Sequence, residues 1–161
     1  MFKEVRCPKC GQTYQVYANP TPTADVIIYE PEYGVVFVER RNIPLGYALP
    51  GGFIDEGEMA ETAAKREMLE ETGLEVELIG LLGVYSNPKR DPRLHTLTTV
   101  YVGRAKDVSK LQAGDDAKSA AFYALDALPT PLVFDHAKIM EDFCAYLDGQ
   151  RFLAGLSGEV D

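Results

Sequence analysis

The chain has 161 residues, 46% of them hydrophobic, which suits one domain with a well-buried core but is too short for two ordinary domains. Its 25 acidic and 16 basic residues give a net charge of −9, which would repel a nucleic-acid backbone and argues against a polymer partner. No apolar run approaches the roughly 20 residues that a bilayer span needs, and the amino terminus lacks the apolar core of a signal peptide. We therefore expect a cytoplasmic protein with no membrane partner.

Residues 1–20 form an amino-terminal arm whose main feature is the sequence CPKCG, with Cys7 and Cys10 as candidate metal ligands. This spacing is typical of a zinc knuckle, but structural zinc requires four ligands. The only other cysteine, Cys144, lies far along the chain in a predicted helix. A complete zinc site is not visible within one chain. The segment therefore indicates a remnant that no longer binds metal, and the alternative is a zinc site shared between two protomers.

The domain is expected to begin with two apolar, β-branched runs, residues 24–29 and 35–39, which predict strands. Residues 30–34 between them contain a proline and a glycine, so the two strands are predicted to form a hairpin. Residues 49–52 predict a loop, in which Gly51 and Gly52 allow close approaches that side chains would block. The carbonyl of Gly51 is therefore a candidate metal ligand.

A helix is predicted over residues 59–72, with Glu58 in its first turn and Gly73 as its stop. At about 100° per residue, its small and apolar side chains form one stripe. The members of that stripe are Ala60, Ala63, Ala64 and Met68.

Three acids of this helix, Glu67, Glu70 and Glu71, lie inside that stripe or at its edge. Acids of a merely solvated helix should lie opposite the alanines. Three anions within one turn also repel each other unless a cation neutralises them. Carboxylate oxygens suit Mg²⁺ or Mn²⁺, so the pattern predicts a divalent-metal site.

The carboxyl-terminal half predicts three more strands and a closing helix. The strands are expected at Val76–Tyr85, 96–104 and 120–123, and the helix at His136–Leu147 with Asp135 as its N-cap. Strands on both sides of the central helix in the sequence, with a second helix at the end, favour an α/β fold in which helices cover both faces of a mixed sheet.

Read as GX5EX7REUXEEXGU, where U is apolar, the central segment resembles the Nudix box at every specified position. These positions are Gly52, Glu58, Arg66, Glu67, Met68, Glu70, Glu71, Gly73 and Leu74. Nine fixed positions make chance improbable. The resemblance implies an α/β/α Nudix sandwich over residues 21–148, followed by a short loose tail over residues 149–161. It also implies hydrolysis of a diphosphate bond in a small nucleotide substrate.

The same resemblance implies roles for individual residues. Glu67, Glu70 and Glu71 are expected to carry Mg²⁺ or Mn²⁺, and Arg66 to orient them. The general base in such enzymes is either a box glutamate or an acid from a later loop, for which Asp116 is the candidate here. Gly52 is expected to lie against the substrate. Glu58 is expected to stabilise the start of the helix or to act behind the metal ligands.

Two segments outside the box, residues 85–95 and 132–136, resemble those of ADP-ribose pyrophosphatases, which are commonly homodimers. Arg90 and Arg93 in the first segment are candidates for phosphate contacts, although such a loop is often only solvated. The arm resembles the second half of the zinc ribbon before some Nudix domains, notably NADH pyrophosphatases.

Three functions remain open on this basis. The expected one is a metal-dependent ADP-ribose pyrophosphatase that yields AMP and ribose 5-phosphate. The alternatives are a pyrophosphohydrolase of nucleoside triphosphates and a non-enzymatic sensor that binds ADP-ribose. The complete glutamate set argues against the sensor.

Overall fold

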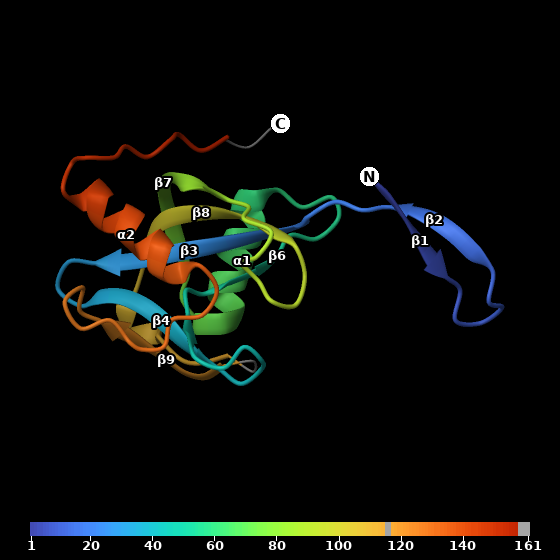
Figure 1. The fold of residues 1–161 in the computed structure, drawn as a ribbon. Coiled ribbons are helices and arrows are strands. Elements are labelled where there is room, and N and C mark those ends of the chain that lie inside the picture. The colour runs from blue at the N-terminus through green and yellow to red at the C-terminus, as the bar shows by residue number, and fades with distance from the viewer. Residues whose placement is uncertain (115–116, 158–161) are drawn as a thin grey trace.

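A computed structural model describes residues 1–114 and 117–157 and shows two parts, a layered body and an amino-terminal arm (Figure 1). The body contains a seven-stranded sheet within these residues, and the arm forms a separate two-stranded sheet. The strands of the body are β3 (Thr21–Glu30), β4 (Gly34–Arg40), β5 (Tyr47–Ala48), β6 (Gly51–Phe53), β7 (Val76–Tyr85), β8 (Thr96–Ala105) and β9 (Ala117–Tyr123). A short 3₁₀ turn, η1, covers Val108–Lys110.

The sheet is mixed, as the sequence predicts. Its strands follow the order β5-β4-β3-β8-β7, with β6 paired to β3 and β9 paired to β4. The central strand β3 runs parallel to β8 and antiparallel to β4 and β6. All five predicted strands are present. The prediction of a loop at Gly51 and Gly52 was wrong, because both residues pair with β3 as part of β6.

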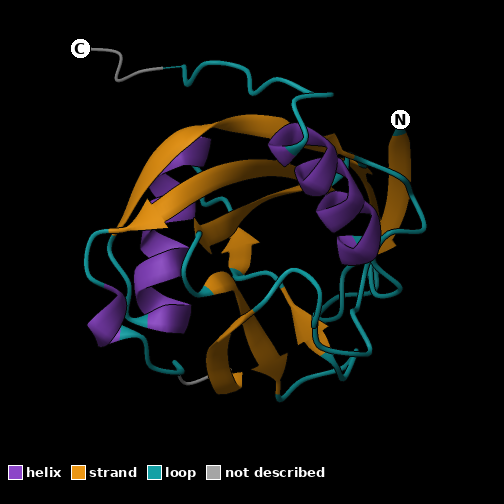
Figure 2. Ribbon diagram, turned by 90° about the vertical axis from the view of Figure 1, so that its left-hand side faces the viewer, coloured by secondary structure: helices purple, strands orange, loops and turns teal. Residues whose placement is uncertain are grey.

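Two helices cover opposite faces of the sheet (Figure 2). On one face, α1 (Ala60–Thr72) packs Ala64 and Met68 against Val26 and Ile28 of β3. On the other face, α2 (His136–Leu147) packs against Ile27 and other residues whose side chains point the opposite way. This alternation along β3 produces the predicted α/β/α sandwich.

The tail after α2 was expected to be loose, but its described part is attached to the body. The backbone N–H of Ala154 donates to the carbonyl of Leu81 in β7 at 2.9 Å, and the reciprocal bond has the same length. Farther on, the backbone N–H of Ser157 donates to Glu61 of α1 at 3.0 Å. The segment is thus held to the body at Ala154 and at Ser157. Sequence periodicity does not predict these hydrogen bonds.

None of the helices in the described residues is both long enough and apolar enough to cross a membrane.

Candidate active site

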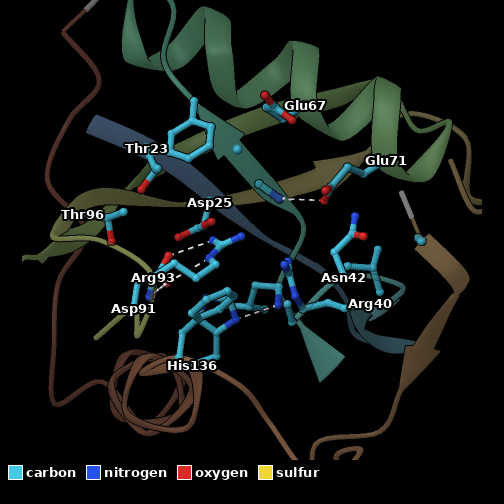
Figure 3. Close-up of a pocket in the computed structure, with 18 of the residues that line it drawn as sticks. Thr23, Asp25, Arg40, Asn42, Glu67, Glu71, Asp91, Arg93, Thr96 and His136 are labelled. Carbon is cyan, nitrogen blue, oxygen red and sulfur yellow. Dashed lines mark hydrogen bonds and ion pairs between the residues drawn. The ribbon is translucent and has the colours of Figure 1, made fainter. Parts of the chain in front are cut away.

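A cavity of about 420 Å³ lies between α1, the middle of the sheet and the start of α2. Acidic side chains of α1, including Glu67 and Glu71, line one side of it. Arg93 and His136 lie on the opposite side (Figure 3). The cavity therefore places the carboxylates of α1 and the guanidinium of Arg93 where both can face one small anionic ligand.

The position of α1 determines where its acids point. Ala63, Ala64 and Met68 are fully buried against the sheet, and this fixes the rotation of the helix about its axis. The helix begins one residue later than predicted, with Met59 as its N-cap. Its predicted stop is confirmed, since Gly73 adopts φ 67° and donates its N–H to the carbonyl of Leu69.

Glu71 and Glu67 lie against the glycines of β6. The N–H of Gly51 donates to the carboxylate of Glu71 at 3.0 Å. At Gly52 an added Cβ would lie 2.2 Å from the carboxyl carbon of Glu67, so only glycine leaves room for that carboxylate. Burial raises the pKa of Glu71 to about 7, and the nearby charges of Glu67 and Asp25 raise it further while the Gly51 N–H opposes the shift.

Arg66 holds three of the box acids together. Its Nε and Nη2 donate to the two carboxylate oxygens of Glu58 at 2.9 and 2.8 Å. Its Nη1 donates to Glu67 at 2.7 Å and to Glu70 at 3.3 Å. The guanidinium thus offsets part of the repulsion between these carboxylates, which a metal ion alone was expected to offset. The Arg66 bonds lower the pKa of Glu58, whereas burial raises that of Glu67.

The donor set fits a hard divalent cation, although no complete ligand cluster is assembled. Among residues 1–114 and 117–157, no three side chains of His, Cys, Asp or Glu gather closely enough to hold a metal ion. Glu67 and Glu71 nevertheless line the cavity beside β6, and Glu70 lines its edge with 59% of its side chain exposed. Carboxylate and carbonyl oxygens of this kind are the ligands that Mg²⁺ and Mn²⁺ prefer.

Asp25 is a cavity residue that the sequence reasoning missed. It lies in β3 as the cross-strand partner of Gly51. Its carboxylate accepts a hydrogen bond from the hydroxyl of Thr98 at 2.7 Å and lies 3.7 Å from Arg90. Burial raises the pKa of Asp25 to about 6, against the opposing effects of Thr98 and Arg90. A single acid inside the apolar run of β3 was the available signal.

Arg90 lines the cavity, but its donors already have partners. Its Nε and Nη2 donate to the carboxylate of Asp135 at 2.9 to 3.1 Å, and its Nη1 donates to the hydroxyl of Thr96 at 2.8 Å. Only 4% of the Arg90 side chain is exposed. Asp135 is the N-cap residue of α2, as predicted, but its side chain makes no cap hydrogen bond because it is bound to Arg90. A phosphate contact by Arg90 would have to compete with this pair.

Arg93 is more accessible than Arg90 and lies over an aromatic ring. Asp91 accepts hydrogen bonds from its Nε and Nη2 at 3.0 and 2.8 Å, which fixes the guanidinium. The guanidinium carbons of Arg93 and Arg40 lie 5.4 and 5.0 Å from the centroid of the Phe134 ring. Phe134 has a φ of 58°, a left-handed conformation that is rare for a non-glycine residue. The sequence resemblance included this phenylalanine without a role for it.

His136 has a structural part in the cavity wall. Its Nδ1 accepts a hydrogen bond from the backbone N–H of Leu49 at 2.9 Å, so the ring joins the start of α2 to the segment before β6. Burial lowers the pKa of His136 to about 3, and the charges of Arg90 and Arg40 act in the same direction. The ring is therefore neutral and acts as an acceptor.

Asp116, the predicted later acid, lies outside the described residues. Gly114 donates its N–H to the carbonyl of Glu71 at 2.9 Å, and Ala117 lines the cavity itself.

Comparisons with known proteins agree with this geometry. The model of the NUDIX domain family matches residues 19–143. An ADP-ribose pyrophosphatase of Methanocaldococcus jannaschii is 44% identical over 140 residues, which cover 84% of this chain and 80% of that protein. A putative 8-oxo-dGTP diphosphatase of Bacillus subtilis is 32% identical over 123 residues, or 76% of this chain and 79% of that one.

A solved structure shares both the fold and the family. The NUDIX domain of NrtR from Shewanella oneidensis, crystallised in complex with ADP ribose, superposes with a TM-score of 0.68 at 26% identity. The match covers 81% of this chain and 90% of that one. With the complete box from Gly52 to Leu74 built around α1, the matched family model and this common fold, the chain belongs to the Nudix family and is a Nudix pyrophosphohydrolase.

Proposed function

We propose that this chain hydrolyses ADP-ribose to AMP and ribose 5-phosphate with the help of a divalent cation. The observation that carries the choice of substrate is the 44% identity, over most of both chains, to a protein named ADP-ribose pyrophosphatase. The cavity supports it, because acids of α1 face Arg93 across a space of about 420 Å³, within the usual range for small-molecule sites.

The proposed cation is Mg²⁺ or Mn²⁺, held by Glu67 and Glu71, by Glu70 at the edge and by the carbonyl of Gly51. When bound, such a cation supplies positive charge to the diphosphate oxygens and activates water for attack. The raised pKa of Glu71 fits this role, because its carboxylate occupies a buried position where a cation would stabilise the charged form.

The chain's own residues orient the reacting groups. Arg66 holds the carboxylates of Glu67 and Glu70 in place through the hydrogen bonds described above. Asp116 is the proposed acceptor of the proton from the attacking water, with Glu70 as the alternative. Gly52 allows the substrate and Glu67 to approach β6 closely.

Arg93 is the proposed cationic contact for the phosphate on the side away from α1. Its guanidinium is held by Asp91 and lies over Phe134, so it is oriented before the substrate arrives. Arg90 is proposed to act behind Arg93, since its pair with Asp135 fixes the loop that carries both arginines.

A nucleoside triphosphate is the alternative substrate. The 32% identity to a putative 8-oxo-dGTP diphosphatase favours it, because the same box on α1 serves either substrate. The products separate the two, since a triphosphate would release pyrophosphate.

The test is a panel of ADP-ribose, NADH, sugar nucleotides and nucleoside triphosphates, each with Mg²⁺ and with a chelator, in which products are identified by chromatography. We expect AMP and ribose 5-phosphate from ADP-ribose, at a kcat/KM at least tenfold above that for any other compound. Preferred turnover of a triphosphate would contradict ADP-ribose as the substrate. Turnover of none of these compounds would contradict the assignment of hydrolytic activity.

The variant Glu71→Gln tests the proposed metal ligands. Glutamine still accepts the hydrogen bond from Gly51, so folding should be retained while kcat falls more than tenfold. Glu77→Gln is the matched control, because Glu77 is an exposed residue of β7 and should keep full activity. Full activity of Glu71→Gln would contradict the proposed ligand set.

A further inference from the structure

The amino-terminal arm stands apart from the body. Its strands β1 (Phe2–Arg6) and β2 (Thr13–Tyr17) pair only with each other among the described strands. Figure 1 shows this hairpin projecting from the body beyond the start of β3. A lone two-stranded hairpin is marginally stable in water, so a further interaction is needed to keep the arm ordered.

The turn between the two strands places Cys7 and Cys10 together at the tip. The N–H of Cys7 donates to the carbonyl of Gln12, and the N–H of Gly11 donates to the carbonyl of Cys7, both at 2.9 Å. Gly11 adopts φ 75°, a conformation that glycine reaches without strain. The segment is therefore a formed turn with two thiols on it, rather than an irregular remnant.

The two thiols are half of a tetrahedral zinc site, and no third His, Cys, Asp or Glu side chain of residues 1–114 and 117–157 gathers with them to complete it. Of its three cysteines, Cys144 lies in α2. Of its two histidines, His136 is bound to Leu49 within the body, and His95 contacts the carbonyl of Ser86. Structural zinc takes four ligands, so the other two must come from another molecule.

We propose that two copies of this chain share one Zn²⁺, bound by Cys7 and Cys10 of each copy. Four thiol protons leave when the metal binds, and the resulting centre carries two negative charges. Each arm, residues 1–20, contains Lys3, Arg6 and Lys9 against one acid, Glu4. Two such positive arms repel each other without the metal, whereas the dianionic centre between them offsets that repulsion.

The second copy also covers apolar surface. The register places Val5 opposite Tyr14, with Val16 on the same face of the hairpin, and 48% of Tyr14 is exposed. Two hairpins joined at their tips can pack these faces together. This arrangement gives the arm the additional partner that a lone hairpin requires.

The experiment uses the full chain, purified without a polyhistidine tag. Elemental analysis should find about half a zinc per chain, and native mass spectrometry should find two chains with one zinc. A zinc-selective chelator, followed by restored Mg²⁺, should convert the dimer to monomer. Cys7→Ser and Cys10→Ser should each lose more than 80% of the zinc, and Cys144→Ser, the matched control, should keep it.

Each outcome bears on the proposal. Zinc below about a tenth of an equivalent, zinc bound to a single chain, or zinc retained by Cys7→Ser would each overturn it. A disulfide between Cys7 and Cys10 in freshly purified protein would also overturn it, since the pair would then be a redox couple. Hydrolysis of ADP-ribose should be unaffected by Cys7→Ser, so a failure of the zinc proposal is distinct from a failure of the proposed function.

Discussion

The carboxylate of Glu67 lies directly against Gly52, where a methyl group would come within 2.4 Å of both carboxylate oxygens. Gly52→Ala should therefore displace the end of the Glu67 side chain, which is flexible, and leave the backbone in place. We expect kcat to fall more than tenfold while the melting temperature changes by only a few degrees. Gly155→Ala is the control, because nothing lies within 4 Å of the added carbon. Unchanged kcat would show that the position of Glu67 does not matter.

His136 predicts a measurable pH dependence of stability. The folded protein keeps the ring neutral to about pH 3, whereas the unfolded chain binds a proton below about pH 6.5. The unfolded state therefore binds more protons as the pH falls from 6.5, and stability decreases by up to about 1.4 kcal/mol per pH unit.

The comparison for this prediction is His136→Gln, which can accept the hydrogen bond from Leu49 but does not titrate. Chemical denaturation at pH 7 and pH 5 should show wild type losing about 2 kcal/mol more than the variant over that interval. Asp25 titrates in both proteins, so its contribution cancels. Equal losses would mean that the ring is not held neutral in the folded state.

Among the elements, the loop after β7 and the start of α2 are joined by the pair of Arg90 and Asp135, 45 residues apart. Asp135→Asn removes the nearer of the two carboxylates that face the buried guanidinium and leaves only Asp25, at 3.7 Å, to balance its charge. The loss should be on the order of 3 kcal/mol in the free energy of unfolding, measured by denaturant titration. Arg93 should become mobile as well, so KM should rise.

The control for Asp135→Asn is Glu141→Gln, which is on α2. Glu141 lies 3.6 Å from Lys138, and both side chains are more than half exposed. An exposed pair of this kind contributes little, so the denaturation midpoint should stay unchanged. If both substitutions lowered the free energy of unfolding equally, the Arg90–Asp135 pair would not be what joins the loop after β7 to α2.

The elements that could be predicted are those with their own periodicity. α1 and α2 were located to within one residue, because apolar spacing and a glycine stop are local properties. The short strands β5 and β6 were missed because their pairing with β4 and β3 depends on contacts distant in sequence. The same limit applies to Asp135, whose sequence position suggests a cap and whose actual partner is Arg90.

The residues of the site also fall into those that local sequence spacing predicts and those that depend on contacts distant in sequence. Glu67, Glu70 and Glu71 of the box share one helix, so their spacing alone indicated their chemistry. The opposite wall is built from β3, the loop after β7 and the start of α2, and no local pattern places Asp25 or Phe134 beside them. The composition of this wall can be known only from the folded structure.

For the molecule as a whole, the separation of arm and body leads to a prediction about removing the arm. A chain lacking residues 1–18 keeps all backbone pairing of the large sheet. Its melting temperature at low protein concentration should stay within a few degrees of wild type, and its kcat within twofold. A truncation after Asp148 is the contrast, because it removes the pairing of Ala154 with Leu81 and should lower the melting temperature. Loss of activity without the arm would mean that the arm supports the site.

Arg66 gives the molecule a resident positive charge among Glu58, Glu67 and Glu70. Glu67 and Glu70 of α1 therefore do not depend on a bound ion to be accommodated, and the chain should reach its native structure in metal-free medium. On the proposed metal dependence, the supply of the cation should change the turnover of each molecule and leave the quantity of folded protein unchanged. Removal and return of the proposed cation should therefore stop and restore hydrolysis without a new round of folding.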